Sequence, residues 1–317
     1  MVNIILPTYN AHETIRQAIA SIAMQDNLQN LLVTVVDDCS NQPYDYLLKD
    51  YHYMNIEILK KANNTGCGQS RQYGIDRCKC EYFTFLDADD CLYSPNAINK
   101  LYTHAKENDL DILYSDFLEE LENGEYLLHE NSGVWMHGKL FKTTYIQSLG
   151  IRFSDVRVNE DHAFNTIALL CGGKSKYLDY ITYVWKYNKS SITRSCDSGK
   201  EYIGDYIKNA EYTICELVMH DVDKDRIIKE INRYILSFYS YYNRFVYAKY
   251  EEQFYALYIE KIKTFWDNTP SFYKDSFKVE ALEEDFYEQC GVQDIINDGI
   301  IFSLTIYDFI DIILKNK

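Results

Sequence analysis

The sequence predicts an α/β fold, in which helices sandwich a mainly parallel sheet and a helical region follows at the C-terminal end. Two observations carry this prediction. Short apolar runs alternate with amphipathic helical patterns in the first two thirds of the chain. From about Ser198 onward, glycine becomes rare and apolar residues recur at helical spacing. We therefore expect an α/β domain at residues 1–197 and a helical region at residues 198–317.

The expected strands are short, apolar and rich in β-branched residues, which is typical of strands buried on both faces. They are Val2–Leu6, Leu31–Val36, Asn55–Leu59, Tyr82–Leu86, Asp111–Phe117 and Tyr177–Tyr187. The first helix carries Ile15, Ile19 and Ile22 on one face, and Asn10 and Glu13 before it have the spacing of a capping box. The segment 135–145 mixes aromatic and basic residues and permits no backbone assignment.

Two later segments contain turn and helix signals. Asn123-Gly124 lies between apolar segments and predicts a hairpin turn. Near the C-terminus, the spacing of Ile300, Leu304, Tyr307 and Ile310 predicts an amphipathic helix. We expect that helix to pack against the body of the protein or against a second subunit, which would make the protein a homo-oligomer.

Composition excludes several classes of partner. The chain has 317 residues, with 32 basic and 48 acidic side chains, and its net charge of −16 argues against binding to nucleic acid or to an anionic membrane surface. Nine scattered cysteines, an odd number, are typical of reduced thiols in a cytoplasmic protein. Neither a signal peptide nor a transmembrane segment is expected. Peripheral attachment at the inner face of the membrane stays open.

Acidic side chains follow two of the expected strands. Asp87, Asp89 and Asp90 end one of them, and Asp37-Asp38 ends another. The carboxyl ends of parallel strands meet at one edge of a sheet, where ligands collect. A group of carboxylates there is suited to Mg²⁺ or Mn²⁺. The alternatives are an acidic helix start at the first cluster and a turn with side-chain caps at the second.

A tyrosine and an arginine accompany these acids. Thr8-Tyr9 leaves the first strand, and an exposed Tyr9 ring beside a carboxylate would suit a pyrimidine base. The polar glycine loop 63–68 lacks the third glycine of a dinucleotide-binding fingerprint, and no Gly-Lys-Ser/Thr follows. Arg71, in the helix after this loop, would either reach a phosphate at the sheet edge or be a solvated helix residue.

Glu160-Asp161 opens a later helix. Acids are favoured in a first helical turn by the helix dipole, and this alone would account for them. The functional interpretation makes one of them a general base for an acceptor hydroxyl, with a pKa that the dipole keeps low. Other polar residues of this part of the chain are interpreted as structural or solvated: His137, Lys139, His162 and Arg194.

Taken in order along the chain, these motifs resemble the family 2 glycosyltransferases with the GT-A fold, a Rossmann-like fold. The resemblance rests on Pro7-Thr8-Tyr9-Asn10, Val36-Asp37-Asp38-Cys39-Ser40, Asn64-Thr65-Gly66 with Arg71, Leu86-Asp87-Ala88-Asp89-Asp90 and Glu160-Asp161. It covers about the first 195 residues, whereas the helical region matches no motif. It implies transfer of a hexosyl or N-acetylhexosaminyl group from a nucleotide-diphosphate-sugar, with uracil as the expected base.

The resemblance also implies a role for each motif. Thr8, Tyr9 and Asp38 would hold the nucleotide base, with Asp37 close by, and Arg71 would lie near the nucleotide. Asp87 would touch the ribose or the metal shell, while Asp89, with Asp90 beside it, would bind Mn²⁺ or Mg²⁺ through the Asp-x-Asp motif. Asp161 would be the catalytic base, and Glu160 would orient either this base or the acceptor.

The implied reaction is a single displacement that inverts the anomeric configuration. The acceptor would be a hydroxyl of a glycan, a cell-surface polymer or a lipid-linked sugar, as in polysaccharide biosynthesis. Two alternatives stay open: a catalytically silent module that binds nucleotide-sugar, and a nucleotidyltransferase. Release of nucleoside diphosphate rather than pyrophosphate would separate the transferase from the latter.

Overall fold

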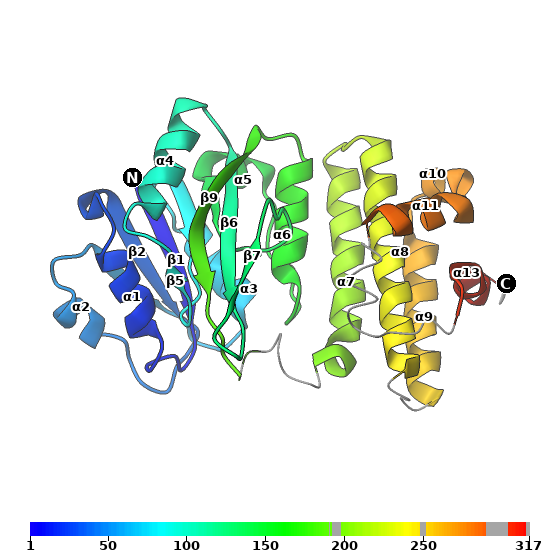
Figure 1. The fold of residues 1–317 in the computed structure, drawn as a ribbon, viewed down its shortest axis with the longest axis horizontal. Helices are drawn as coiled ribbons and strands as arrows, with labels where there is room; N and C mark the ends of the chain where they lie inside the picture. Colours follow the sequence, from blue (N-terminus) through cyan, green and yellow to red (C-terminus); the bar gives the residue numbers. More distant parts are fainter. Residues whose placement is uncertain (190, 192–197, 248–251, 290–303, 315–317) are drawn as a thin grey trace. The chain divides into compact units, whose positions relative to one another are not determined.

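The computed structural model describes residues 1–189, 191, 198–247, 252–289 and 304–314 (Figure 1). The chain forms two compact units, Met1–Ser198 and Gly199–Lys317, and each is described by itself. The division falls beside Ser198, where the sequence changes from alternating strands and helices to helices. That the first unit alone is the catalytic domain stays a prediction.

The first unit is built on a nine-stranded sheet with the order β3-β2-β1-β4-β8-β6-β9-β5, and β7 pairs with β6. The strands are β1 (Val2–Thr8), β2 (Leu31–Asp37), β3 (Ile56–Lys60), β4 (Tyr82–Phe85), β5 (Cys91–Leu92), β6 (Ile112–Glu120), β7 (Tyr126–His129), β8 (Lys139–Lys142) and β9 (Ser175–Trp185). Strands β1 to β4 pair in parallel, whereas β8 runs antiparallel to both β4 and β6. The mainly parallel sheet with helices is the α/β fold that the sequence predicts.

Helices cover both faces of this sheet (Figure 1). They are α1 (Ile15–Ala23), α2 (Tyr46–Asp50), α3 (Cys67–Ile75), α4 (Ala97–Glu107), α5 (Thr143–Leu149) and α6 (Glu160–Leu170). Successive side chains of a strand point to opposite faces. In β1, Ile4 and Leu6 therefore join the core that α1 and α4 complete, and Ile5 faces α3. Because the strands are covered on both sides, their sequences are apolar throughout.

The strand ends place the candidate residues at one edge. β1 ends at Thr8, its neighbour β2 ends at Asp37, and β4, on the other side of β1, is followed by Asp87. Because these three strands are parallel, their carboxyl ends open on the same edge. The fold thus brings together motifs that are about 30 to 50 residues apart in the sequence.

Local predictions differ in their outcome. The hairpin turn is confirmed, since Gly124 connects β6 and β7 with a φ of +81°. The capping box is wrong: Thr14 precedes α1 and makes no side-chain cap hydrogen bond. Asn10 instead has a φ of 49° and accepts a hydrogen bond from the backbone N–H of Asn41 at 3.0 Å, which joins two loops of the sheet edge.

The second unit is helical in its described residues. Its helices are α7 (Ser198–Met219), α8 (Lys224–Tyr247), α9 (Glu252–Asn268), α10 (Ser271–Ser276), α11 (Val279–Gln289) and α13 (Ile306–Leu314). Helix α13 is amphipathic as predicted, and it buries Phe309 and Ile310. The predicted apolar face is wrong at Tyr307, which is exposed, and Ile300 lies outside the described residues.

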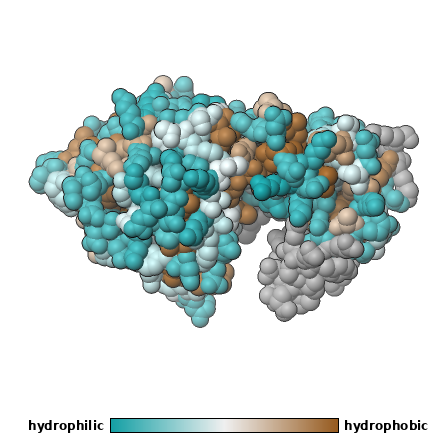
Figure 2. Space-filling model, turned by 90° about the horizontal axis from the view of Figure 1, so that it is seen from above, coloured by the Kyte–Doolittle hydropathy of each residue, from teal (hydrophilic) through white to brown (hydrophobic). Residues whose placement is uncertain are grey.

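Surface character agrees with the charge balance. Figure 2 shows the face of the first unit in that view as mainly hydrophilic, with small separate apolar areas. Among the described residues, none of the helices is long and apolar enough to cross a membrane.

Candidate active site

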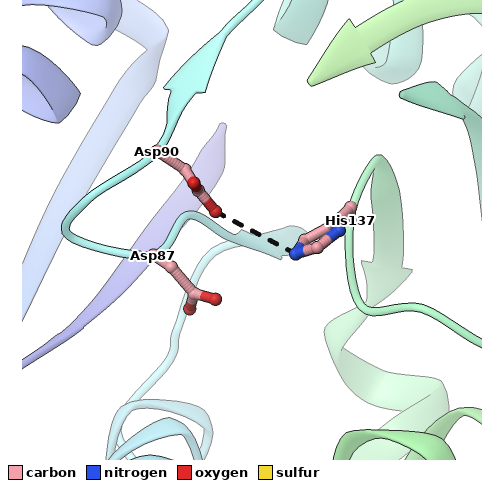
Figure 3. Close-up of side chains that lie close together, drawn as sticks. All are labelled: Asp87, Asp90 and His137. Atoms are coloured by element: carbon pink, nitrogen blue, oxygen red, sulfur yellow. Dashed lines mark ion pairs between the residues drawn. The ribbon is translucent and has the colours of Figure 1, made fainter. Parts of the chain in front are cut away.

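Three side chains that could hold a metal meet at the carboxyl edge of the sheet. Asp87, Asp90 and His137 each present one ligand atom, and these atoms lie within 4.8 Å of one another. Figure 3 shows the three side chains pointing toward one space, with 4.0 Å between His137 Nε2 and Asp90 Oδ2. Asp87 and Asp90 come from the loop after β4, and His137 comes from the loop before β8. We call these three residues the acid cluster.

Hydrogen bonds hold the Asp90 carboxylate in place. The Tyr183 hydroxyl donates to its Oδ2 at 2.5 Å, and the backbone N–H of Lys186 donates to its Oδ1 at 2.8 Å. Burial raises the pKa of Asp90 well above its ordinary value, and the charges of Asp87 and Asp89 add to this. The carboxyl therefore lies where ionisation is costly unless a positive charge is near.

The donor set of the acid cluster fits a divalent cation. Burial lowers the pKa of His137 to about 3, so that its imidazole is neutral at physiological pH and can be a ligand. His137 Nδ1 is buried and has no hydrogen-bond partner in the described part of the chain. Two carboxylates and one imidazole suit Mn²⁺ better than Mg²⁺, which prefers oxygen ligands alone.

The predicted metal ligand Asp89 lies beside this cluster but is not one of its members. It is half-buried, and its Oδ2 accepts a hydrogen bond from Asn188 Nδ2 at 2.7 Å. Its carboxylate is thus oriented by the segment that follows β9. A direct role for Asp89 in metal binding stays a prediction.

Arg71 joins the acid cluster to the pair of acids that opens α6. Its Nη2 lies 2.7 Å from Asp87 Oδ1, and its Nη1 lies 3.0 Å from Glu160 Oε1. Arg71 is 5% exposed, and burial opposes its charge, yet Asp87 and Glu160 raise its pKa well above the ordinary value. The same contact lowers the pKa of Asp87 against the effect of burial. A planar guanidinium can bridge two carboxylates in this way.

Glu160 is fixed tightly at the start of α6. Burial raises its pKa to about 7, the neighbouring Asp161 adds to the rise, and Arg71 opposes it. Helix α3 approaches so closely at Gly68 that a Cβ there would lie 2.5 Å from Glu160 Cγ. Only glycine fits beside this carboxylate without displacing it.

Asp161 is half-buried, and its Oδ1 accepts a hydrogen bond from the backbone N–H of His162 at 2.8 Å. The expectation that the helix dipole keeps its pKa low is wrong. Burial raises the pKa of Asp161, and Arg71 and the His162 amide only partly offset this effect. An aspartate with a raised pKa is a stronger base, which suits proton transfer better than the predicted weak base would.

The residues predicted to hold the nucleotide base lie at the ends of β1 and β2. Tyr9 is 51% exposed, so its ring is available for stacking. Asp38 is buried, and its carboxylate accepts hydrogen bonds from the Thr65 and Gly66 amides and pairs with Lys61 at 2.7 Å. Asp38 therefore shapes the glycine loop. Its predicted contact with the base stays a prediction.

Thr8 and Asp37 also have structural partners. The Thr8 hydroxyl donates to the carbonyl oxygen of Val36 at 3.2 Å, and Asp37 Oδ1 accepts from the Ser40 amide at 2.8 Å. These contacts hold the turn after β2 against the end of β1. Both roles in base recognition stay predictions.

Sequence patterns gave little reason to select several residues of this site. The sequence predicts a structural or solvated role for His137 and Lys139. Lys139 is indeed structural, since its buried ammonium donates to the carbonyl oxygens of Ser132 and Trp135, whereas His137 belongs to the acid cluster. Tyr183, which holds Asp90, lies 93 residues away in the sequence. Arg194 lies outside the described residues. The only sequence signal for His137 is its place in an aromatic-rich segment.

Residues 3–158 match the model of the family described as glycosyl transferase family 2. This part of the chain belongs to that family. The matched residues include the ends of β1 and β2, the glycine loop and the acid-rich loop after β4. Glu160 and Asp161 come directly after the matched region.

Two curated relatives of this chain are bacterial. Glycosyltransferase GlyA of Streptococcus pneumoniae is 24% identical over 222 residues, which cover 61% of this chain and 31% of GlyA. The poly(ribitol-phosphate) beta-N-acetylglucosaminyltransferase TarP of Staphylococcus aureus is 27% identical over 203 residues, or 58% of this chain and 62% of TarP. The chain thus aligns with less than two thirds of the length of each relative.

Solved structures agree with the fold. A crystal structure of S. aureus TarS 1–349 matches with a TM-score of 0.73 and 17% identity, and the match covers 96% of this chain and 93% of the TarS chain. TarS 1–349 has also been solved in complex with UDP-GlcNAc. This likeness confirms the GT-A fold of the chain.

Proposed function

We propose that this protein transfers a sugar from a nucleotide-diphosphate-sugar to an acceptor hydroxyl with the help of a divalent cation. The observation that carries the proposal is the bridge made by Arg71. The Arg71 guanidinium contacts Asp87 of the acid cluster and Glu160 of α6 at the same time. A metal-bound diphosphate of the donor and a general base for the acceptor would therefore lie in one site.

The proposed donor is a UDP-sugar. TarS 1–349, which has the same fold, was solved with UDP-GlcNAc and with UDP. The exposed ring of Tyr9 is suited to stacking on the base. Asp37 ends β2, and the amide of Asp38 after it donates to the carbonyl oxygen of Thr8, the neighbour of Tyr9. The proposed acceptor is a sugar hydroxyl of a surface glycan or of a lipid-linked glycan.

The chemical step follows from the positions of the acids. Asp161 accepts the proton of the acceptor hydroxyl while that oxygen forms a bond to the anomeric carbon. The bond from the anomeric carbon to the diphosphate oxygen breaks, and the nucleoside diphosphate leaves with its electron pair. Glu160, held by Arg71 and by the close approach of Gly68, keeps the start of α6 in place.

The acid cluster would stabilise the leaving group through a bound cation. Asp87, Asp90 and His137 would hold a divalent cation, which offsets the negative charge that develops on the diphosphate. Because the acceptor attacks opposite the leaving group, a single displacement inverts the anomeric configuration. No covalent intermediate between sugar and protein is required.

The test is a donor assay with the full chain. UDP-, GDP-, CDP- and TDP-sugars are incubated with Mn²⁺ and a panel of neutral glycosides, and the released nucleotide is identified by chromatography. We expect UDP in equal amount to the glycoside formed. Binding of UDP without turnover would support a silent nucleotide-sugar-binding module, and release of pyrophosphate would support a nucleotidyltransferase.

A further inference from the structure

Two tryptophans lie side by side next to the acid cluster. Trp135 comes from the loop between β7 and β8, and Trp185 is the last residue of β9. Their ring centroids are 5.2 Å apart. The His137 imidazole lies parallel to the Trp135 ring, with an interplanar angle of 5° and 6.0 Å between centroids, and it is 5.4 Å from the Trp185 ring. The two indoles therefore lie directly beside the acid cluster, against His137.

The loop that carries Trp135 is held by buried groups. Lys139 is 1% exposed, and its ammonium donates to the carbonyl oxygens of Ser132 and Trp135. Gly138 has a φ of +65°, and a Cβ there would lie 2.8 Å from Ser115 Oγ, so that only glycine fits. The backbone of Trp135 is thus fixed before any ligand binds, which lowers the entropy cost of binding.

The same loop is tied to the helix of the proposed base. Asn165, which is fully buried in α6, donates from Nδ2 to the carbonyl oxygen of Val134 at 2.7 Å. Asn165 lies about one turn after Asp161 on that helix. The loop therefore connects the acid cluster, through His137, with the helix that carries Asp161. In the proposed reaction, the donor diphosphate would lie at the acid cluster and the acceptor hydroxyl at Asp161.

Both indoles pack inward but are not enclosed. Trp135 and Trp185 are half-buried and lie against the main hydrophobic core. Phe117, whose ring contacts Trp135, and Tyr183, whose ring stacks on His137, are 0% and 2% exposed. A fixed aromatic ring with an open part suits the flat C–H face of a pyranose ring, and the polar edge of such a sugar stays in water.

We propose that Trp135 and Trp185 form the subsite for a pyranose ring of the acceptor glycan. This inference rests on the proposed function and specifies its acceptor. An acyclic polyol phosphate would be a poor ligand, because it offers no flat apolar face and brings negative charge to a chain whose net charge is −16.

The first experiment uses the acceptor dependence of the rate. Trp135→Leu keeps apolar bulk but removes the flat ring, and Trp135→Phe keeps a smaller ring. Aromatic stacking contributes about 0.5–1.5 kcal/mol beyond burial, so we expect Trp135→Leu to raise the acceptor KM about three- to tenfold. The effect of Trp135→Phe should be smaller. The donor KM should be unchanged, and Trp266→Phe, in the second unit, should leave both KM values unchanged.

The second experiment does not depend on activity. The chain has only three tryptophans, so in the Trp266→Phe variant the indole fluorescence reports on Trp135 and Trp185 alone. We expect methyl glycosides of glucose, galactose or N-acetylglucosamine to change this fluorescence, and ribitol 5-phosphate to leave it unchanged. If Trp135→Leu does not fold, Trp185→Leu replaces it in the first experiment.

Three outcomes would overturn the inference. They are an unchanged acceptor KM in both leucine variants, a raised donor KM in place of a raised acceptor KM, and fluorescence that responds to none of the methyl glycosides. Failure of the proposed function would look different, because no sugar donor would then release nucleotide with the wild-type protein, while the fluorescence titration would still report sugar binding.

Discussion

Replacing Arg71 by methionine tests the bridge on which the proposed site depends. The side chain of Arg71 is 6% exposed, and its partners Glu160 and Asp87 are 8% and 27% exposed. Removing one partner of a buried ion pair costs about 3–5 kcal/mol, because the remaining charges lose their compensation. Since Asp87 is partly exposed, we expect a loss near the lower limit, about 3 kcal/mol at pH 8.

This loss should depend on pH. Without Arg71, burial raises the pKa of Asp87 and raises that of Glu160 further. An acid whose pKa is higher in the folded than in the unfolded state makes the folded state more stable as the pH falls. The difference in unfolding free energy between wild type and Arg71→Met should therefore shrink between pH 8 and pH 5, to about 1 kcal/mol.

Thermal unfolding of the two proteins at pH 5 and pH 8 measures this difference. For a unit of this size, about 3 kcal/mol corresponds to a fall in Tm of about 6–12 °C. The matched control is Arg152→Met, which removes an exposed ion pair with Asp76 (2.8 Å) and should cost less than about 1 kcal/mol at either pH. A small, pH-independent loss for Arg71→Met, equal to that of Arg152→Met, would refute the bridge.

Four further predictions concern single parts of the molecule. Gly68→Ala should displace Glu160 and lower kcat at least tenfold, because the new Cβ would lie 2.5 Å from Glu160 Cγ. Asp161→Asn should lower kcat roughly a hundred- to ten-thousand-fold and leave UDP affinity unchanged in calorimetry. His137→Gln should reduce the preference for Mn²⁺ over Mg²⁺ in metal titrations of the rate, since it removes the nitrogen ligand. Deleting the residues after Gly299 should lower the Tm of the second unit, because α13 buries apolar side chains worth about 1.5–3 kcal/mol each.

Each of these four has a control or a contradicting result. Gly204→Ala in α7 should be tolerated, since the nearest atom to its Cβ would be the flexible end of Lys261 at 3.5 Å. Near-normal turnover of Asp161→Asn would show that another residue is the catalytic base. Full activity of the wild type in excess chelator would exclude the acid cluster as a metal site. An unchanged Tm after the deletion would show that α13 is dispensable for stability.

The strands could be predicted from the sequence because they are buried on both faces. An apolar run such as Leu31–Val36 leaves little choice of structure when helical patterns flank it. The alternation of strands and helices also predicts that the strands are parallel, and parallel strands place Asp37 and Asp87 at one edge of the sheet. The helix start at Thr14 was missed because Asn10 and Glu13 have capping-box spacing, while tertiary contacts hold Asn10 in another conformation.

The site was harder to predict because its contacts join distant segments. Arg71 and Glu160 are 89 residues apart, and nothing in either local sequence shows that the two meet. The pKa of Asp161 was predicted in the wrong direction, since the helix dipole can be inferred from sequence but burial cannot. His137 was not selected for the same reason, because its role depends on what surrounds it.

The most direct test of the central claim is the stoichiometry of one reaction. Wild-type protein, UDP-GlcNAc, Mn²⁺ and a neutral glycoside acceptor are incubated together, and UDP and the new glycoside are quantified by chromatography. The proposed site predicts that the two form in equal amounts, that the new linkage has the inverted configuration, and that Asp161→Asn forms neither at a comparable rate. Equal rates for the wild type and Asp161→Asn, or a product with retained configuration, would contradict it.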